Sequence, residues 1–313
     1  MKSNKKVFLL GPAHPFRGGI ADTQNQLAQN LKLLGYQVFV YTFTKQYPNF
    51  FFPGKTQFSD EQPPNAIKIE RKIHSYKPTN WNKVAQTINA EKPDTVIFRY
   101  WSPVLAPCWA GIARNLGKEI KKIGLIDNWK PHEKKPWDSL LTRIFYKQMN
   151  GFATLSFAVG LQIEATQPNS HVWKGFHPIA DKLPRAIPQE KARKILGWPE
   201  NKKIVLFFGL VRKYKGLDLL ITAFSKPPLN KSDVVLAIVG EAYESEKKYT
   251  EMIESLALKD RVLLDFNYAT TEKARIVFSA ADLVAQTYRN ATQSGVTPLA
   301  YHFQVPLLVS DIP

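Results

Sequence analysis

The sequence predicts an α/β protein built from two Rossmann-like, doubly wound domains in tandem. Short apolar runs typical of buried strands alternate with amphipathic helices, and the alternation restarts after a proline-rich interruption. The length of 313 residues is too long for one ordinary domain and fits two of about 150 residues each. Hydrophobic residues make up 44% of the chain and charged residues 22%, which supplies apolar cores and excludes disorder as the main state.

The first domain is expected over residues 1–176. Its first strand, at 6–11, ends at a Pro/Gly-rich turn, and a helix over 21–34 follows. The remaining expected strands are 37–43, 94–100, 120–126 and 152–157, and the remaining expected helices are 81–90, 104–116, 139–149 and 159–165. Because strands and helices alternate, the strands are expected to form a parallel sheet.

Residues 177–198 are interpreted as a linker, because Pro178, Pro184 and Pro188 lie there in a basic stretch without a strand pattern. The second domain is expected over 199–313. Its expected strands are 204–208, 234–239, 262–266, 283–286 and 306–310, and its expected helices are 216–225, 245–257, 271–280 and 294–303.

Composition limits both the cellular compartment in which the protein is expected and the classes of binding site that it can contain. The single cysteine, Cys108, excludes a disulfide framework and a Cys-rich metal site, and it indicates a reducing compartment. No apolar stretch approaches the ~18 residues that a membrane-spanning helix needs. We therefore expect a cytoplasmic protein, with any membrane attachment peripheral and at the inner face.

The net charge of +17 is concentrated in the first half of the chain. Residues 1–180 carry 24 Lys+Arg and 11 Asp+Glu, whereas residues 181–313 carry 19 and 15. A basic surface attracts nucleic acid, anionic lipid headgroups or phosphorylated substrates, and charge alone does not choose among them.

Several familiar motifs are absent from the sequence. It contains no Gly-x-Gly-x-x-Gly, which disfavours a nicotinamide cofactor, and no Asp-x-Asp, which disfavours a metal-dependent sugar-nucleotide site. His132-Glu133 does not continue as His-Glu-x-x-His, because residue 136 is proline. No metal and no cofactor are therefore expected.

Two glycine-bearing turns carry positive evidence for function. In the first domain, Gly18-Gly19 follows a strand and opens a helix, so backbone N–H groups and the helix amino terminus are available to an anion. In the second domain, Arg212 and Lys215-Gly216 follow a strand and precede a helix. Cations already in place there would stabilise a diphosphate leaving group. An ordinary strand-to-helix turn and a solvated basic turn are the alternative interpretations.

These turns, with Ser294-Gly295-Val296-Thr297-Pro298-Leu299 before the last strand, resemble glycosyltransferase family 4 over essentially the whole chain. The resemblance implies a retaining enzyme of the GT-B fold, whose two domains face a cleft. It implies that the second domain binds a nucleotide-sugar donor and the first binds the acceptor. It also implies that Arg212 and Lys215 contact the donor diphosphate, that Gly18 and Gly19 close over it, and that no metal is required.

A third cluster, Asp127-Asn128 with His132, follows the strand at 120–126, at the sheet edge where such folds bind ligands. His132 is a candidate for positioning an acceptor hydroxyl or the donor sugar, and Asn128 is a candidate on the acceptor side. The family often has a histidine directly after this strand, where this chain has Asp127, so Asp127 and His132 are alternatives for that part. A surface histidine without a role is the other interpretation.

The chain departs from the family near its end. The resemblance implies two glutamates beneath the donor, and the alignment places Thr292 and Ala300 at these positions. The family uses one glutamate for the nucleotide ribose, and the other lies near the sugar ring. The turn Gln293-Ser294-Gly295-Val296 remains, and together with Thr292 it is the expected donor-binding segment, acting through N–H groups at a helix start.

These features predict a retaining glycosyltransferase that moves a sugar from a nucleotide diphosphate to a saccharide or lipid-linked acceptor in cell-surface polysaccharide synthesis. Asp127 and His132 join Arg212 and Lys215 as candidate catalytic residues. The expected partners are the nucleotide sugar, the acceptor and an anionic membrane surface, with no nucleic acid. One alternative is a catalytically silent GT-B-like protein that binds sugar nucleotides, which the missing glutamates favour. Another is a basic nucleic-acid-binding protein, which charge alone supports.

The chain stops directly after the strand at 306–310, whereas the family continues through further helices. We therefore expect a truncated version of a longer protein, whose second domain is incomplete and is the less stable half. Leu307, Leu308 and Val309 are expected to be poorly shielded.

Overall fold

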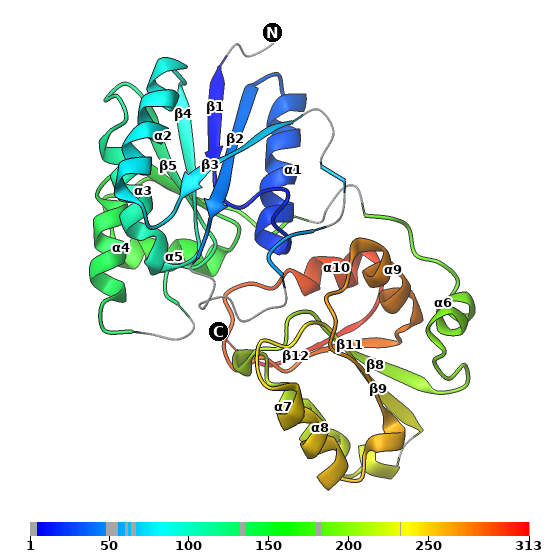
Figure 1. Ribbon diagram of the computed structural model, residues 1–313. Helices are drawn as coiled ribbons and strands as arrows, with labels where there is room; N and C mark the ends of the chain where they lie inside the picture. Colours follow the sequence, from blue (N-terminus) through cyan, green and yellow to red (C-terminus); the bar gives the residue numbers. More distant parts are fainter. Residues whose placement is uncertain are drawn as a thin grey trace. The chain divides into compact units, whose positions relative to one another are not determined.

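The computed structural model describes residues 5–47, 56–59, 62–63, 67–131, 135–178, 183–231 and 233–312. Two compact units, residues 1–178 and 179–313, divide the chain (Figure 1). Each unit has its own parallel β-sheet with helices on both faces. The prediction of two Rossmann-like α/β domains is therefore confirmed.

The first unit contains the strands β1 (Lys6–Leu10), β2 (Gln37–Lys45), β3 (Lys68–His74), β4 (Thr95–Tyr100), β5 (Lys121–Ile126), β6 (Gly151–Thr154) and β7 (Val172–Lys174). Its helices are α1 (Gly19–Leu33), α2 (Pro78–Ala90), the 3-10 helix η2 (Pro103–Leu105), α3 (Ala106–Arg114), α4 (Asp138–Tyr146) and α5 (Phe157–Thr166). The described strands form a seven-stranded sheet in the order β3-β2-β1-β4-β5-β6-β7. The strand order reverses between β1 and β4, and such a switch point is where open α/β sheets bind ligands.

Side chains along β1 alternate between the two layers that cover the sheet. Val7 and Leu9 pack with Ala28 of α1, whereas Phe8 and Leu10 belong to the large core that also contains side chains of α2 and α3. Figure 1 shows α1 on one side of this sheet and α2 and α3 on the other. Both faces of β1 are thus buried, and the loop after it is held by a rigid strand.

The second unit contains α6 (Gln189–Leu196) and the strands β8 (Lys203–Phe208), β9 (Val234–Val239), β10 (Val262–Asp265), β11 (Leu283–Gln286) and β12 (Leu307–Val309). Its other helices are the 3-10 helix η3 (Lys213–Lys215), α7 (Leu217–Phe224), the 3-10 helix η4 (Leu229–Lys231), α8 (Glu246–Ser255), the 3-10 helix η5 (Lys259–Arg261), α9 (Thr271–Ala280) and α10 (Val296–His302). The described strands form a five-stranded sheet in the order β10-β9-β8-β11-β12. The switch point of this sheet lies between β8 and β11.

Two cores cover the faces of the second sheet. Leu206 and Phe208 of β8 pack with Phe278 of α9 and Ala300 of α10. Phe207, which points to the other face, packs in the core formed with α7 and α8. Because β8 is buried on both faces, the basic turn that follows it starts from a fixed position.

The range interpreted as a linker, 177–198, is partly helical. Helix α6 lies within it and packs against α9 of the second unit. Arg193 of α6 is buried, and its guanidinium donates to Asp282 Oδ2 at 2.7 Å and to three backbone oxygens. The surrounding prolines make the helical spacing of α6 difficult to recognise in the sequence. Gly197 ends the helix in a left-handed conformation, with φ 66°.

Strands β3 and β7 are absent from the sequence-based prediction. β3 is an edge strand with the sequence KIERKIH, whose charges interrupt the apolar pattern and also discourage pairing with other chains. β7 has only three residues. On the second sheet, β12 is the outer strand, and Leu308 and Val309 are 54% and 57% exposed, as the sequence predicts. Leu307 differs from the prediction, because it is half-buried and packs against the core that contains α9 and α10.

Candidate functional site

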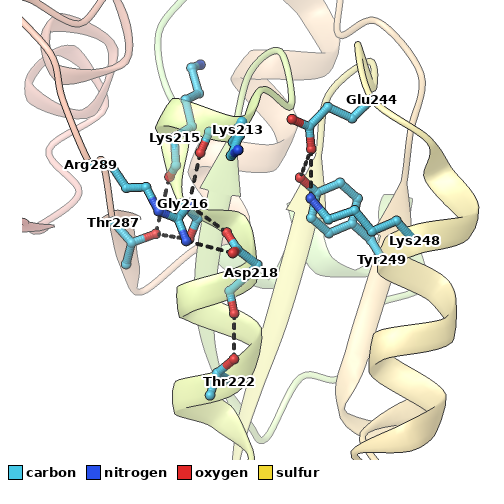
Figure 2. Close-up of polar contacts among 10 residues, drawn as sticks. All are labelled: Lys213, Lys215, Gly216, Asp218, Thr222, Glu244, Lys248, Tyr249, Thr287 and Arg289. Carbon is cyan, nitrogen blue, oxygen red and sulfur yellow. Dashed lines mark hydrogen bonds and ion pairs between the residues drawn. The ribbon is translucent and has the colours of Figure 1, made fainter.

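The carboxyl end of β8 leads into a short basic turn. Gly209 turns the backbone with φ 94°, and η3 then carries Lys213 and Lys215 to the start of α7. Gly216 closes the turn with φ 63°, and a Cβ added there would lie 2.0 Å from the backbone oxygen of Thr287. Only glycine fits at position 216, which lets the turn lie directly against the loop after β11 (Figure 2).

Lys215 is buried, with 8% of its surface exposed, although its ammonium group carries charge. Its Nζ lies 5.5 Å from the centroid of the Tyr288 ring, and no described residue accepts a hydrogen bond from it or forms an ion pair with it. Burial, and to a smaller extent the charge of Arg212, lowers the pKa of Lys215 from 10.5 to about 8. A buried cation without a counter-ion among the described residues is costly, and a bound anion would offset this cost.

Arg212 differs from Lys215 in being exposed. Its guanidinium carbon lies 4.8 Å from the centroid of Tyr243, a residue of the loop after β9. The charges of Arg212 and Lys215 interact, so the structure brings the two predicted cations together on one turn. The Lys213 side chain is also exposed, between the two in sequence.

The segment after β11 lies beside this turn. The hydroxyls of Tyr288 and Ser294 are 3.2 Å apart, and Tyr288 is the residue whose ring contacts Lys215. A Cβ added at Gly209 would lie 3.6 Å from Val296 Cγ2 and 3.0 Å from Lys215 Nζ. The expected donor-binding residues Ser294 and Val296 are therefore neighbours of the basic turn.

A hollow of about 190 Å³ lies at the carboxyl ends of β11 and β12. Its polar lining comes from Gln286, Thr292, Gln293, Ser294 and Ser310, together with Tyr288. None of the described lining residues carries a charge at neutral pH. Hydroxyls and amides donate and accept hydrogen bonds, which suits the hydroxyls of a sugar or a ribose.

The helix expected at 294–303 is shorter in the structure. Helix α10 begins at Val296, and the N–H of Val296 already donates to Ser294 Oγ at 3.2 Å. Gly295, the residue before α10, has a right-handed conformation. Thr292 is half-buried and lines the hollow, whereas Ala300 is fully buried in the core. Position 300 therefore offers no group to a ligand.

In the first unit, Gly18 and Gly19 lie at the amino terminus of α1. Gly18 has φ 105° and ψ 162°, a conformation reserved for glycine, and its carbonyl oxygen accepts from the N–H of Asp22 at 3.1 Å. A Cβ added at either glycine would meet no described atom within 4 Å. The first turn of α1 therefore borders open space, as an anion contact would require.

Asp127 follows β5 directly and is buried. Arg99, on β4, donates from Nε to Asp127 Oδ2 at 2.6 Å, and its Nη2 donates both to Oδ1 and to Thr23 Oγ1 of α1. This ion pair joins β4, β5 and α1 beside the switch point of the first sheet. A carboxylate with both oxygens held by a buried arginine is poorly placed to take a proton from a hydroxyl.

Asn128 and His132 are the other two candidates in the cluster that follows β5. Asn128 is half-buried beside Asp127. His132 lies outside the described residues, so its part stays a prediction. Arg99 was not a candidate from sequence, because an arginine inside a strand belongs to no motif.

Two kinds of feature are absent from the described ranges. Within them, no group of three or more His, Cys, Asp or Glu side chains is arranged to hold a metal ion. None of the helices in those ranges combines the length and the apolar character needed to cross a bilayer.

Similarity to known proteins covers the fold of the whole chain and the sequence of its second unit. Residues 188–313 match the family model for glycosyl transferases group 1. Among solved structures, the Anabaena protein HepE in complex with UDP-glucose is 18% identical, with a TM-score of 0.75 over 98% of this chain and 80% of that chain. The chain has the GT-B fold.

Two further structures support this fold. Sucrose-phosphate synthase from Thermosynechococcus elongatus is 15% identical, with a TM-score of 0.72 over 98% of this chain and 82% of that chain. The catalytic domain of starch synthase IV from Arabidopsis thaliana, bound to ADP and acarbose, is 12% identical, with a TM-score of 0.67 over 97% and 82%. No curated protein matches the sequence. The narrower assignment to glycosyltransferase family 4 stays a prediction.

Proposed function

We propose that this protein is a retaining glycosyltransferase that moves a sugar from a nucleoside-diphosphate donor to a saccharide or lipid-linked acceptor. The observation that carries the proposal is the buried ammonium of Lys215, which no described anion neutralises. Arg212 adds a second positive charge on the same turn, at the switch point of the second sheet. A diphosphate supplies the missing negative charge at this edge.

The chemistry needs this charge when the bond between the anomeric carbon and the diphosphate oxygen breaks. Negative charge then develops on the diphosphate, and Lys215 and Arg212 stabilise it without having to move. The acceptor hydroxyl forms the new bond to the anomeric carbon on the same face and passes its proton to the departing diphosphate oxygen, which lies on that face. Since Arg99 holds both oxygens of Asp127, we assign Asp127 to shaping the first-unit site rather than to taking this proton.

The neutral hollow after β11 is proposed to hold the donor's hydroxyl groups. Its amides and hydroxyls replace the two glutamates that the family resemblance implies at positions 292 and 300. HepE bound to UDP-glucose and starch synthase IV bound to ADP suggest uridine and adenosine diphosphates as the first nucleotides to test. Cell-surface polysaccharide remains the proposed setting of the acceptor.

Thermal-shift measurements with UDP-, GDP- and ADP-sugars test this proposal. At least one donor should raise the melting temperature, and release of the nucleoside diphosphate should follow when an acceptor is added. Arg212→Ala and Lys215→Ala should each lower turnover by about 10²–10³-fold. Lys213→Ala, which removes an exposed side chain from the same turn, is the control. Unchanged turnover in both variants would overturn the assignment of the diphosphate site.

A sugar-nucleotide-binding protein without transferase activity is the second candidate. Ala300 favours it, because a buried methyl group stands where the resemblance implies a carboxylate. This candidate predicts a thermal shift with a nucleotide sugar but no release of nucleoside diphosphate with any acceptor. The transferase proposal predicts both.

We also propose that the first unit docks on an anionic membrane surface through α4. Trp137 and Leu140 are 53% and 61% exposed, and Arg143 and Lys147 lie exposed on the following turns. Lys135 Nζ lies 5.8 Å from the Trp137 ring. Exposed aromatic and apolar side chains beside cations are typical of helices that lie at a bilayer surface. Each cation near anionic lipid contributes about 1 kcal/mol.

Sedimentation with lipid vesicles tests this surface. The protein should bind phosphatidylglycerol vesicles in a salt-sensitive manner and bind phosphatidylcholine vesicles weakly. Replacing Trp137 and Leu140 with alanine should reduce binding, whereas Leu33→Ala, at an exposed leucine of α1, should not. Equal binding to both vesicle types, or none at low salt, would contradict the proposal.

A further inference from the structure

The backbone of Lys213, in the middle of the basic turn, is held from two sides by charged side chains. Arg289, in the loop after β11, donates from Nη1 to the carbonyl oxygen of Lys213 at 2.9 Å. The carboxylate of Glu244, in the loop after β9, lies near the backbone N–H of Lys213, which contributes to lowering the pKa of Glu244. Charged side chains from two loops far away in the sequence therefore lie against the backbone of Lys213, and Figure 2 shows the hydrogen bond from Arg289.

Arg289 is itself fixed by a carboxylate at the start of α7. Its Nη1 and Nη2 donate to the two oxygens of Asp218 at 2.8 and 2.6 Å, and its backbone N–H donates to the carbonyl oxygen of Tyr214 at 2.7 Å. The bidentate pair holds the pKa of Asp218 below its usual value and raises that of Arg289. Thr287 adds a bond from its hydroxyl to the carbonyl oxygen of Gly216 at 2.8 Å.

Glu244 has a comparable support on the opposite side. Its carboxylate accepts from the hydroxyl of Tyr249 at 2.6 Å and from Lys248 Nζ at 3.0 Å. Tyr249 belongs to the core between the sheet and α8, so its hydroxyl is a fixed donor. Partial burial raises the pKa of Glu244, but hydrogen bonds from Tyr249 and Lys248, together with the nearby backbone N–H of Lys213, outweigh this and lower it.

The basic turn needs restraint from neighbouring residues because it carries two positive charges close together. Arg212 and Lys215 repel each other, and Lys215 would gain solvation if its ammonium moved into water. The bonds to Lys213, Tyr214 and Gly216 oppose that relaxation from the backbone side. Within the described residues, no carboxylate forms an ion pair with either cation.

We propose that Arg289 and Glu244 are positioning residues, which hold the backbone of Lys213 so that Arg212 and Lys215 meet a donor diphosphate in a fixed arrangement. This inference rests on the proposed function of the turn. The loop after β11 would then have two functions. It lines the hollow, and through Arg289 it also holds the proposed phosphate-binding turn in place. Neither residue needs to touch the donor in this role.

The test compares Arg289→Met and Glu244→Gln with wild type in affinity for UDP, measured by calorimetry, or for GDP or ADP if wild type binds one of these instead. Loss of one charged hydrogen bond to the turn should weaken binding by about 10- to 100-fold. Arg289→Lys, which keeps the charge but not the fork, should fall between Arg289→Met and wild type. Arg275→Met removes an arginine paired with Glu272 on α9 of the same unit and should leave affinity unchanged.

A second readout needs no donor. The apparent pKa of Lys215, measured by competitive acetylation and mass spectrometry, should be near 8 in wild type and rise by about one unit in Arg289→Met, because the released ammonium reaches water. Arg212, whose charge interacts with this ammonium, and Tyr288, whose ring it contacts, are unchanged in the variant. A merely destabilised protein with the turn in place would not show this rise.

An unchanged pKa of Lys215 in both Arg289→Met and Arg289→Lys would overturn the inference, whatever the affinities. Equal UDP affinity in wild type and Arg289→Met would overturn it as well. Failure of wild type to bind UDP, GDP and ADP would instead overturn the proposed function. The acetylation measurement would still decide whether Arg289 holds the turn.

Discussion

Replacing Lys215 with methionine is expected to stabilise the free protein while abolishing its affinity for a nucleoside diphosphate. Methionine fills a similar volume beside Tyr288 and Gly209 without carrying a charge. The wild-type lysine is held charged in a buried place where nothing described neutralises it. Such a buried charge lowers the free energy of unfolding of the ligand-free protein, and it is kept because it contributes to ligand binding.

The expected magnitude follows from the pKa of Lys215, which is about 8 in the folded protein against 10.5 for an ordinary lysine. At about 1.4 kcal/mol for each pKa unit, holding the ammonium charged costs about 3 kcal/mol at pH 7. Loss of the contact with the Tyr288 ring offsets about 0.5–2 kcal/mol, so a net gain of about 1–3 kcal/mol is expected.

The same pKa sets the pH dependence. Because the folded pKa lies below the unfolded one, the unfolded state binds more protons between about pH 8 and pH 10.5. The wild-type free energy of unfolding therefore gains a contribution over this window as the pH rises. The Lys215→Met variant lacks this contribution, so the two proteins converge at high pH.

Urea unfolding of the full chain at pH 7 and pH 10 measures both effects, and hydrogen exchange at the amides of β8 and β9 isolates the second unit. UDP should stabilise wild type and not the variant. Lys213→Met, at an exposed position on the same turn, is the control. A variant less stable than wild type at pH 7, or one with the wild-type pH slope, would refute the buried, unneutralised ammonium.

Three further predictions concern stability and reactivity. Gly216→Ala should cost at least about 2 kcal/mol in urea unfolding, because φ is 63° and a backbone oxygen lies 2.0 Å from the new Cβ; Gly197→Ala, with φ 66° and open space, should cost only about 1 kcal/mol. Arg99→Met should lower the free energy of unfolding by about 3–5 kcal/mol, because it removes the arginine charge that neutralises the buried Asp127 carboxylate, and a loss under about 1 kcal/mol would contradict this. Burial raises the pKa of Cys108, so a thiol reagent should label it only on unfolding, and rapid labelling of the folded protein would count against its burial.

The strand and helix order was predictable because buried parallel strands have nearly uninterrupted apolar sequences. The expected strands at 234–239 and 283–286 coincide with β9 and β11. β3 has no such pattern, because an edge strand is stable with charges on it. Helix α6 was missed because the prolines that flank it dominate the local composition, while the Arg193 contacts that anchor it are made with residues distant in sequence.

The residues of the candidate site also fall into some that the sequence predicts and some that it does not. Arg212 and Lys215 were predictable, since both lie in one short segment whose residue types indicate an anion site. The pairs that support the sites join residues far apart, such as Arg289 with Asp218, 71 positions away, and Arg99 with Asp127, 28 positions away. Such contacts depend on strand order and register, which no local pattern encodes.

The calorimetric affinity of the full chain for UDP, GDP and ADP at pH 7 and pH 9.5 tests the diphosphate site on Lys215 without any variant. At least one of the three nucleotides is expected to bind at pH 7. Its affinity should fall about tenfold or more at pH 9.5, because Lys215 in the free protein loses its proton near pH 8. Absence of binding by all three nucleotides, or an affinity equal at the two pH values, would contradict a diphosphate site built on Lys215.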